Sequence, residues 1–225
     1  ANPCASGPET DGSGGFGFFA GLGNAGPHVM PGNYTVQLVA NDAVLDSKPL
    51  RIVGDPAVRL ADNERKKYND VATELHELQR RATTVQSALN ALNRQITAAT
   101  PLVRDGAAIP ADVKAQYDAF AKEWDGVRRK FGVGAPAGLA GRGGGGGRGA
   151  VVDPENVVAR LGGAKSSVGA FWETPSASVM QQYNDAKAML PKAITDANAF
   201  IAKASAMSST LKAHNVTLTV PAPIK

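Results

Sequence analysis

Hydrophobic residues recur every three or four positions over long stretches of the chain, which predicts long α-helices. The clearest stretch follows Asp62, a residue type that often caps a helix, and stops before Pro101. Its apolar positions alternate in steps of three and four and share one side of a helix. They are Tyr68, Val71, Leu75, Leu78, Ala82, Val85, Leu89, Leu92 and Ile96.

Three further stretches repeat this spacing and begin at proline-containing helix starts. Pro110 opens the second helix, Asp153-Pro154 the third and Thr174-Pro175 the last, in which Pro191 predicts a kink. Apolar seams of matching period, joined by short links, favour an antiparallel bundle of three to four helices. The seams are Val113, Tyr117, Phe120, Trp124, Val127 and Phe131; Val157, Leu161 and Val168; and Val179, Tyr183, Ala186, Leu190, Ala193, Ala197, Phe200, Ala204, Met207 and Leu211.

The pattern before the first helix has period two and predicts β-structure. Residues 33–40 place Tyr34, Val36 and Leu38 on one face of a strand. Asn41-Asp42 supplies a turn, and residues 50–53 lie in the antiparallel strand that follows. A lone hairpin is marginally stable in water, so we expect it to complete a sheet with the tail, with the helices or with another chain. Residues 216–220 also alternate and are expected to form a last short strand.

Glycine divides the chain into segments. Nine of the 25 glycines lie in residues 1–32 and ten in 132–149, where ordering the backbone costs most entropy. The fold class predicted is therefore mainly α: a helical bundle preceded by a hairpin or partial β-sandwich and a glycine-rich tail. The segments are a tail (1–32), a hairpin (33–56), the first half of the bundle (57–131), a glycine-rich loop (132–150) and the second half with an extended C-terminal tail (151–225).

Composition and spacing offer little for catalysis. One cysteine, Cys4, excludes an internal disulfide, and the three histidines lie in distant segments without ligand spacing, so we expect no cofactor, no metal site and no enzyme activity. We interpret His76 as a surface residue and the carboxylate pair Glu74 and Glu77 as structural. The sequence contains no run of about 18 apolar residues, so it predicts no membrane-spanning helix.

Basic residues are present but diffuse, with a net charge of +4. The glycine-rich loop carries an RGG-like element at Arg142 without interleaved aromatic residues, which is a weak signal, and we expect no nucleic-acid partner. Basic clusters at 65–67, 80–81 and 128–130 favour a solvated stripe, with contact to an anionic membrane surface as the alternative.

Two groups of residues are candidates for binding other protein subunits. Phe16, Phe18 and Phe19 lie in the glycine-rich tail without a local core, and they either pack into the parent fold or anchor the tail in a groove on a partner. Tyr34, Val36 and Leu38 form the apolar face of the hairpin, whose edge is open to strand addition.

Two motifs of the hairpin resemble a known family. Pro31-Gly32-Asn33-Tyr34-Thr35-Val36 and Pro49-Leu50-Arg51-Ile52, followed by Asp55-Pro56 and a long helix, are similar to the C-terminal region of secreted bacterial proteins with sortilin-like or sialidase-like β-propellers, often labelled glycosyl hydrolases. In that family these strands end an immunoglobulin-like or fibronectin-like module. Ala57 stands where the family has arginine, and the sequence contains no Asp-box repeat of the propeller.

The resemblance implies a periplasmic or secreted bacterial location. The function expected is a non-catalytic structural subunit docked on a larger extracytoplasmic assembly, for example on the periplasmic face of a respiratory or photosynthetic membrane complex. The alternative is a C-terminal accessory fragment of a secreted sialidase-like or sortilin-like glycosyl hydrolase, whose activity would lie in the propeller.

Overall fold

The computed structural model describes residues 27–58, 60–134, 153–169 and 174–224. A two-stranded hairpin comes first and the helices follow, which confirms the predicted mainly α class. The elements are β1 (Gly32–Ala40), β2 (Ala43–Ile52), α2 (Asp62–Arg104), α3 (Ala111–Lys130), α5 (Val157–Gly169) and α6 (Ala177–Lys212).

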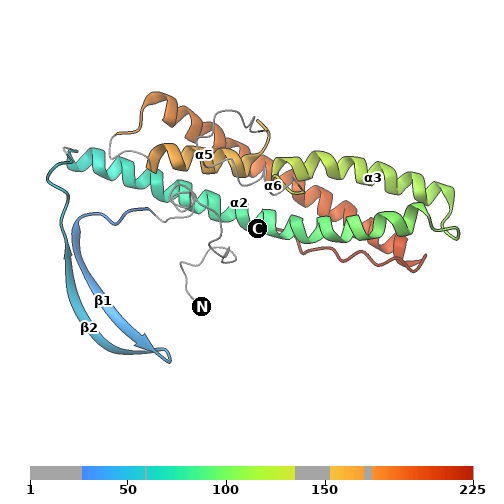
Figure 1. Cartoon of the computed structure of the whole chain (residues 1–225), viewed down its shortest axis with the longest axis horizontal. Coiled ribbons are helices and arrows are strands. Elements are labelled where there is room, and N and C mark those ends of the chain that lie inside the picture. Colours follow the sequence, from blue (N-terminus) through green and yellow to red (C-terminus); the bar gives the residue numbers. More distant parts are fainter. Residues whose placement is uncertain (1–26, 59, 135–152, 170–173, 225) are drawn as a thin grey trace, which may run out of the picture.

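The helices form an elongated bundle from which the hairpin projects at one end (Figure 1). α2 and α6 run in one direction, and α3 and α5 run back, lying one after the other along the rod. α2 therefore packs on both α5 and α3, and α6 contacts all three other helices. This arrangement places two shorter helices one after the other where an ordinary three-helix bundle has one long helix.

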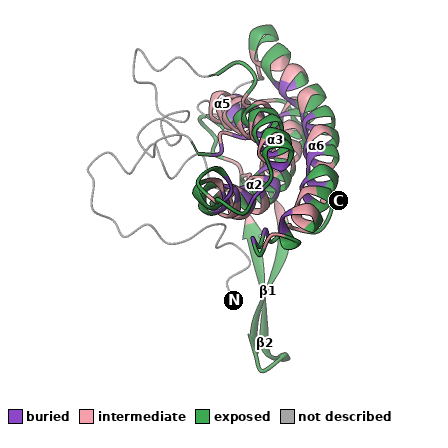
Figure 2. Ribbon diagram, turned by 90° about the vertical axis from the view of Figure 1, so that its right-hand side faces the viewer, coloured by how far each residue is buried: buried purple, intermediate pink, exposed green. Residues whose placement is uncertain are grey.

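The predicted apolar seams face one another in the core (Figure 2). Every seam position predicted for α3 is buried, and so is Phe131, the residue directly after the helix. The Phe200 ring of α6 packs on Phe120 and Trp124 of α3, with ring centroids 4.8 and 5.0 Å apart. The bundle thus closes its hydrophobic stripes against each other.

α2 extends beyond the predicted end. Pro101 lies inside the helix, which continues to Arg104, and Ala99 and Val103 extend the buried seam. Because Pro101 stands in the last turn, its missing N–H costs one helical hydrogen bond, and the burial of Val103 offsets part of that cost. The prediction of a helix end before Pro101 was wrong.

Two helices begin later than predicted, because nearby polar side chains cap them better. Asp153 forms a turn whose carboxylate accepts the N–H of Glu155 (2.9 Å), and Asn156 then accepts the N–H of Ala159 (3.1 Å) at the start of α5. Ser176 caps α6 by accepting the N–H of Val179.

α3 ends in a Schellman motif at Gly132. The N–H of Gly132 bonds to Arg129 O (3.0 Å) and that of Val133 to Arg128 O (2.9 Å). Gly132 has a φ of +63°, a left-handed conformation that favours glycine.

The C-terminal segment lies along the bundle without forming a strand. Val216 and Leu218 are buried and their neighbours point outward, as the alternation predicted. The Val216 N–H donates to Leu211 O (3.1 Å), and side chains of α6 hold the rest of the segment: Ser208 Oγ donates to Leu218 O (2.6 Å), and the Asn198 side chain bonds both backbone groups of Ile224. The predicted last strand was wrong, since the segment pairs with a helix surface.

The hairpin is tightly turned and carries one β-bulge. Asn41 and Asp42 both have positive φ (50° and 62°), as the two central residues of a type I′ turn require. The strands pair antiparallel from Gly32↔Ile52 to Ala40↔Ala43, and the register shift between Leu38 and Val39 leaves Leu45 of β2 as the extra residue of a β-bulge.

Candidate functional site

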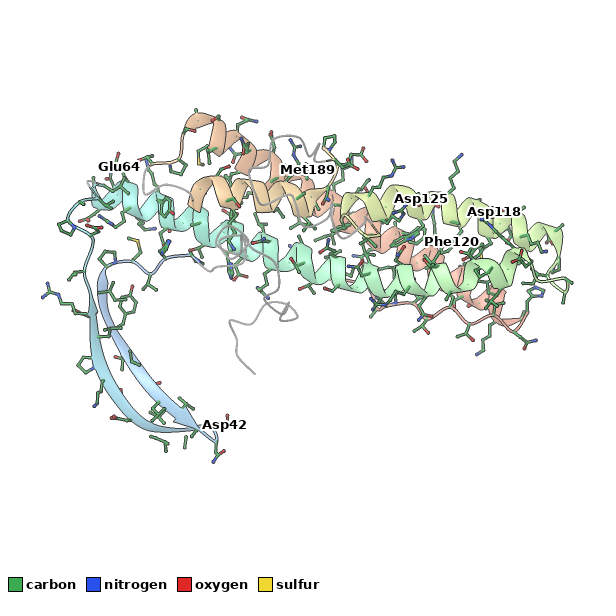
Figure 3. All side chains as sticks on the ribbon, viewed as in Figure 1. Asp42, Glu64, Asp118, Phe120, Asp125 and Met189 are labelled. Atoms are coloured by element: carbon green, nitrogen blue, oxygen red, sulfur yellow. The ribbon has the colours of Figure 1, made fainter. Side chains whose placement is uncertain are left out.

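The hairpin has an exposed apolar face that the fold itself does not use, and Val39, Val44 and Leu45 near its tip are exposed as well. Tyr34, Val36 and Leu38 project from one side of β1, and Leu50 lies directly opposite Tyr34. These side chains, called the apolar face below, are 37%, 54%, 61% and 44% exposed, respectively. Figure 2 shows the hairpin beyond its base pair Gly32–Ile52 in the colour of exposed residues, and in Figure 3 Asp42 marks its tip, away from the bundle.

Two charged residues complete this side of the hairpin. Lys48 lies opposite Val36 and Asp46 opposite Leu38, and their side chains form an ion pair at 3.7 Å. Each charge therefore has a partner within the hairpin. The exposed apolar side chains beside this pair are available to another surface.

The base of the hairpin encloses a groove of about 400 Å³ against α2. The Tyr34 hydroxyl donates to Met30 O (2.6 Å) and holds the incoming chain against β1. Burial raises the pKa of the Tyr68 hydroxyl in the groove wall. The wall also includes Met30, Pro31, Ile52, Val53 and Arg65.

The structure places the predicted binding residues of the hairpin together. Tyr34, Val36 and Leu38 share the exposed face, with Leu50 added from β2. Phe16, Phe18 and Phe19 lie outside the described residues. The sequence motif of β2 contained Leu50, but its place beside Tyr34 depends on the register, which the bulge at Leu45 shifts by one residue.

The bundle contains a polar cluster that was not predicted from the sequence. Lys165 of α5 is 8% exposed, and its Nζ lies 3.1 Å from His76 Nδ1 and 2.9 Å from Gln79 Oε1. Burial lowers the pKa of Lys165, and burial followed by the charge of Lys165 lowers that of His76. The signal was present, because Lys165 follows Leu161 by four residues on an apolar stripe.

His76 is therefore a half-buried contact of α5 rather than a surface residue. The described residues contain no group of three histidine, cysteine or acidic side chains that could hold a metal ion. The Lys165 cluster joins α2 to α5, and its hydrogen bonds explain how a lysine is accommodated there.

The neighbouring carboxylates also link helices. Glu74 of α2 accepts one hydrogen bond from the Tyr183 hydroxyl and forms an ion pair with Lys187 (2.6 Å), both on α6. These contacts, that of Lys187 first, lower the pKa of Glu74. Glu77 pairs with Arg80 one turn away at 2.6 Å. The structural interpretation of both carboxylates agrees with this geometry.

Members of each basic cluster pair with acidic side chains. Lys66 contacts Asp70 (2.7 Å), Arg80 contacts Glu77, and Lys130 contacts Asp196 of α6 (2.6 Å). The first two pairs are exposed and contribute little to stability, whereas the partly buried Lys130–Asp196 pair links α3 to α6; all three reduce the local positive potential. Contact with an anionic membrane surface stays a prediction.

Comparisons with known proteins find no similar family, sequence or fold: no protein-family model, no curated protein and no solved structure matches the chain. Among the described residues, no helix is both long and apolar enough to span a bilayer.

Proposed function

We propose that this protein is a non-catalytic structural subunit whose hairpin docks on a larger extracytoplasmic assembly. The observation that carries the proposal is the apolar face, where Tyr34, Val36, Leu38 and Leu50 are all at least one-third exposed on a two-stranded sheet. Such a hairpin gains stability when a third strand or a covering layer removes its apolar side chains from water.

The bundle supports the same interpretation. Its helices bury their apolar stripes against one another, so the bundle serves as a stiff support for the projecting hairpin. The extracytoplasmic location, for example the periplasmic side of a membrane complex, rests on the resemblance carried by the two hairpin motifs. Docking then joins a rigid rod to a partner through a small element at one end.

A charge placed on the apolar face tests the proposal. Full-length tagged chain is produced in its source cell and purified under mild conditions with its partners. We expect Val36→Asp to reduce partner recovery at least tenfold, because a carboxylate would be buried against apolar side chains. Ser47→Asp adds the same charge on the other face of the hairpin and is expected to keep recovery within twofold. Recovery of wild-type chain as a monomer without partner subunits would contradict the proposal.

A second function is favoured by one further observation. The two motifs behind the family resemblance pair with each other in the structure, Asn33 with Arg51 and Tyr34 with Leu50. In this alternative the hairpin closes a β-sandwich within a propeller-bearing glycosyl hydrolase, and the bundle is its accessory end. Co-purification of the hairpin with propeller blades encoded by the same gene, together with sialoside or glucan hydrolysis by that product, would support it.

A further inference from the structure

The two free edges of the hairpin differ in their capacity to pair with another strand, and we propose that β1 is the docking edge and binds the edge strand of a β-sheet domain in a partner polypeptide. This inference rests on the proposed function, since it names the edge and the kind of partner for the same site.

The register shows which backbone groups face outward. Pro49 has no N–H, so its pair with Thr35 is a non-hydrogen-bonded pair of the ladder. Hydrogen-bonded and non-hydrogen-bonded pairs alternate along an antiparallel ladder, so the pairs made by Asn33 and Gln37 are also non-hydrogen-bonded. The backbone N–H and C=O groups of these three residues therefore point away from β2, along the free edge of β1.

The free edge of β2 is blocked in several ways. The outward position at Pro49 offers no donor, and the outward N–H of Ser47 already donates to the Asp46 carboxylate at 2.8 Å. The bulge at Leu45 interrupts the regular spacing of the strand. β2 also carries the charges of Asp46, Lys48 and Arg51. Proline, bulges and charged side chains are the features by which proteins prevent strand addition.

The free edge of β1 has none of these features. Residues 33–40 contain no proline and no charged side chain, and the extra residue of the bulge belongs to β2. The outward backbone groups come from Asn33, Thr35 and Gln37, whose side chains lie on the face opposite the apolar face. A strand that pairs here therefore places every second side chain beside Tyr34, Val36 and Leu38.

The chemistry of this edge defines the partner. A charged residue next to Val36 or Leu38 would face apolar side chains, so the incoming strand is uncharged, with apolar residues at alternate positions. Pairing with β1 of a second copy would join two apolar faces side by side and leave both uncovered. A partner sheet with its own hydrophobic layer extends that layer over the apolar face, and for this reason we assign the edge to such a domain.

Hydrogen exchange at single amides tests the assignment. The full chain is compared alone and in the purified native complex, with fragmentation that resolves individual residues. We expect the Thr35 and Gln37 amides to exchange at least 100-fold more slowly in the complex, because they become hydrogen-bonded. The outward amide of Arg51 on β2 is expected to change less than threefold. Protection of Arg51 without Thr35 and Gln37 would overturn the choice of edge.

Proline substitutions at one cross-strand pair provide the matched test. Gln37 and Ser47 lie opposite each other, and both N–H groups point outward, so proline removes no hydrogen bond between β1 and β2 at either position. We expect Gln37→Pro to lower partner recovery at least tenfold and Ser47→Pro to lower it less than twofold. Equal losses, or loss for Ser47→Pro only, would overturn the inference.

The remaining outcomes separate the inference from the proposed function. If Val36→Asp lowers partner recovery but the Thr35 and Gln37 amides stay unprotected in the complex, the hairpin docks through its apolar face and not through its edge. This result overturns the inference and leaves the proposed function standing. Protection of these amides in the chain alone would mean that its own N-terminal tail pairs with β1. If that protection increases with protein concentration, a second copy of the chain pairs with β1; either result overturns the inference. Absence of any partner in the complex preparation defeats both proposals.

Discussion

The contact of Phe200 with α3 predicts how the bundle is stabilised. Phe200 is 1% exposed, and its ring packs on Phe120 at 4.8 Å and on Trp124 at 5.0 Å. Truncating a buried phenylalanine to alanine removes the transfer free energy of the ring and leaves a cavity, at a total cost of about 3 to 5 kcal/mol. Since single domains have about 5 to 15 kcal/mol of stability, Phe200→Ala is expected to remove a large fraction.

Urea unfolding followed by far-UV circular dichroism measures this loss. With a slope of about 2 kcal/mol per molar urea, a loss of about 4 kcal/mol lowers the midpoint by about 2 M. Phe200→Leu keeps most of the volume and loses mainly the two ring contacts, at a cost of about 1 to 2 kcal/mol. Val36→Asp, in the hairpin outside the core, is expected to change the free energy by less than about 0.5 kcal/mol.

Two results would refute the reasoning. A cost below about 1 kcal/mol for Phe200→Ala would mean that α3 and α6 do not pack through these rings. A loss for Val36→Asp as large as that for Phe200→Ala would mean that the hairpin belongs to the cooperative core, against its exposure in the structure.

Four further predictions concern single side chains. Tyr117→Phe should cost about 1 to 2 kcal/mol in urea unfolding, because the buried hydroxyl donates to Ile96 O at 2.9 Å, whereas an equal midpoint would mean that this bond is replaced by water. Gly132→Ala should cost about 1 to 2 kcal/mol, since its φ is +63° and a Cβ would lie 2.6 Å from Asn156 Nδ2; a cost near zero would contradict the left-handed C-cap. The pKa of His76 in the folded chain lies below its ordinary value of 6.5, so the unfolded chain binds more protons between the two values and the free energy of unfolding should fall as pH drops through that window. His76→Asn should flatten this part of the curve of stability against pH, and an unchanged slope would exclude His76 as its source. The folded pKa of Lys165 lies below 10.5, so stability should rise with pH up to that value, and Lys165→Met should remove the rise.

Much of the bundle could be predicted because each seam carries its own periodicity. Steps of three and four from Tyr68 to Ile96 leave one buried stripe, and the structure buries seven of those nine positions below 5% exposure. The turn at Asn41-Asp42 was equally local, since both residue types tolerate positive φ. Features that depend on a few neighbouring residues were therefore accessible from sequence.

Features that depend on distant contacts were not. The extension of α2 past Pro101 depends on burial of Val103 in the assembled core, and the path of the C-terminal segment depends on Asn198 and Ser208 of α6. The contact of Lys165 with His76 joins residues 89 positions apart. In the candidate site, the face of β1 was predictable, whereas the addition of Leu50 required the register of β2.

The asymmetry of the hairpin argues against exposure by accident. If the hairpin functioned as a free surface, selection against aggregation would favour blocking both edges, and β2 has a proline, a bulge and three charged residues. β1 lacks such protection although it carries most of the apolar face. A sheet edge left open beside exposed tyrosine, valine and leucine side chains is protected from aggregation when another strand covers it. In the docking proposed above, β1 is therefore covered and the blocked edge of β2 is expected to face solvent. The same distribution of residues thus accounts for both the exposed face in the isolated chain and the orientation in which we expect it to dock.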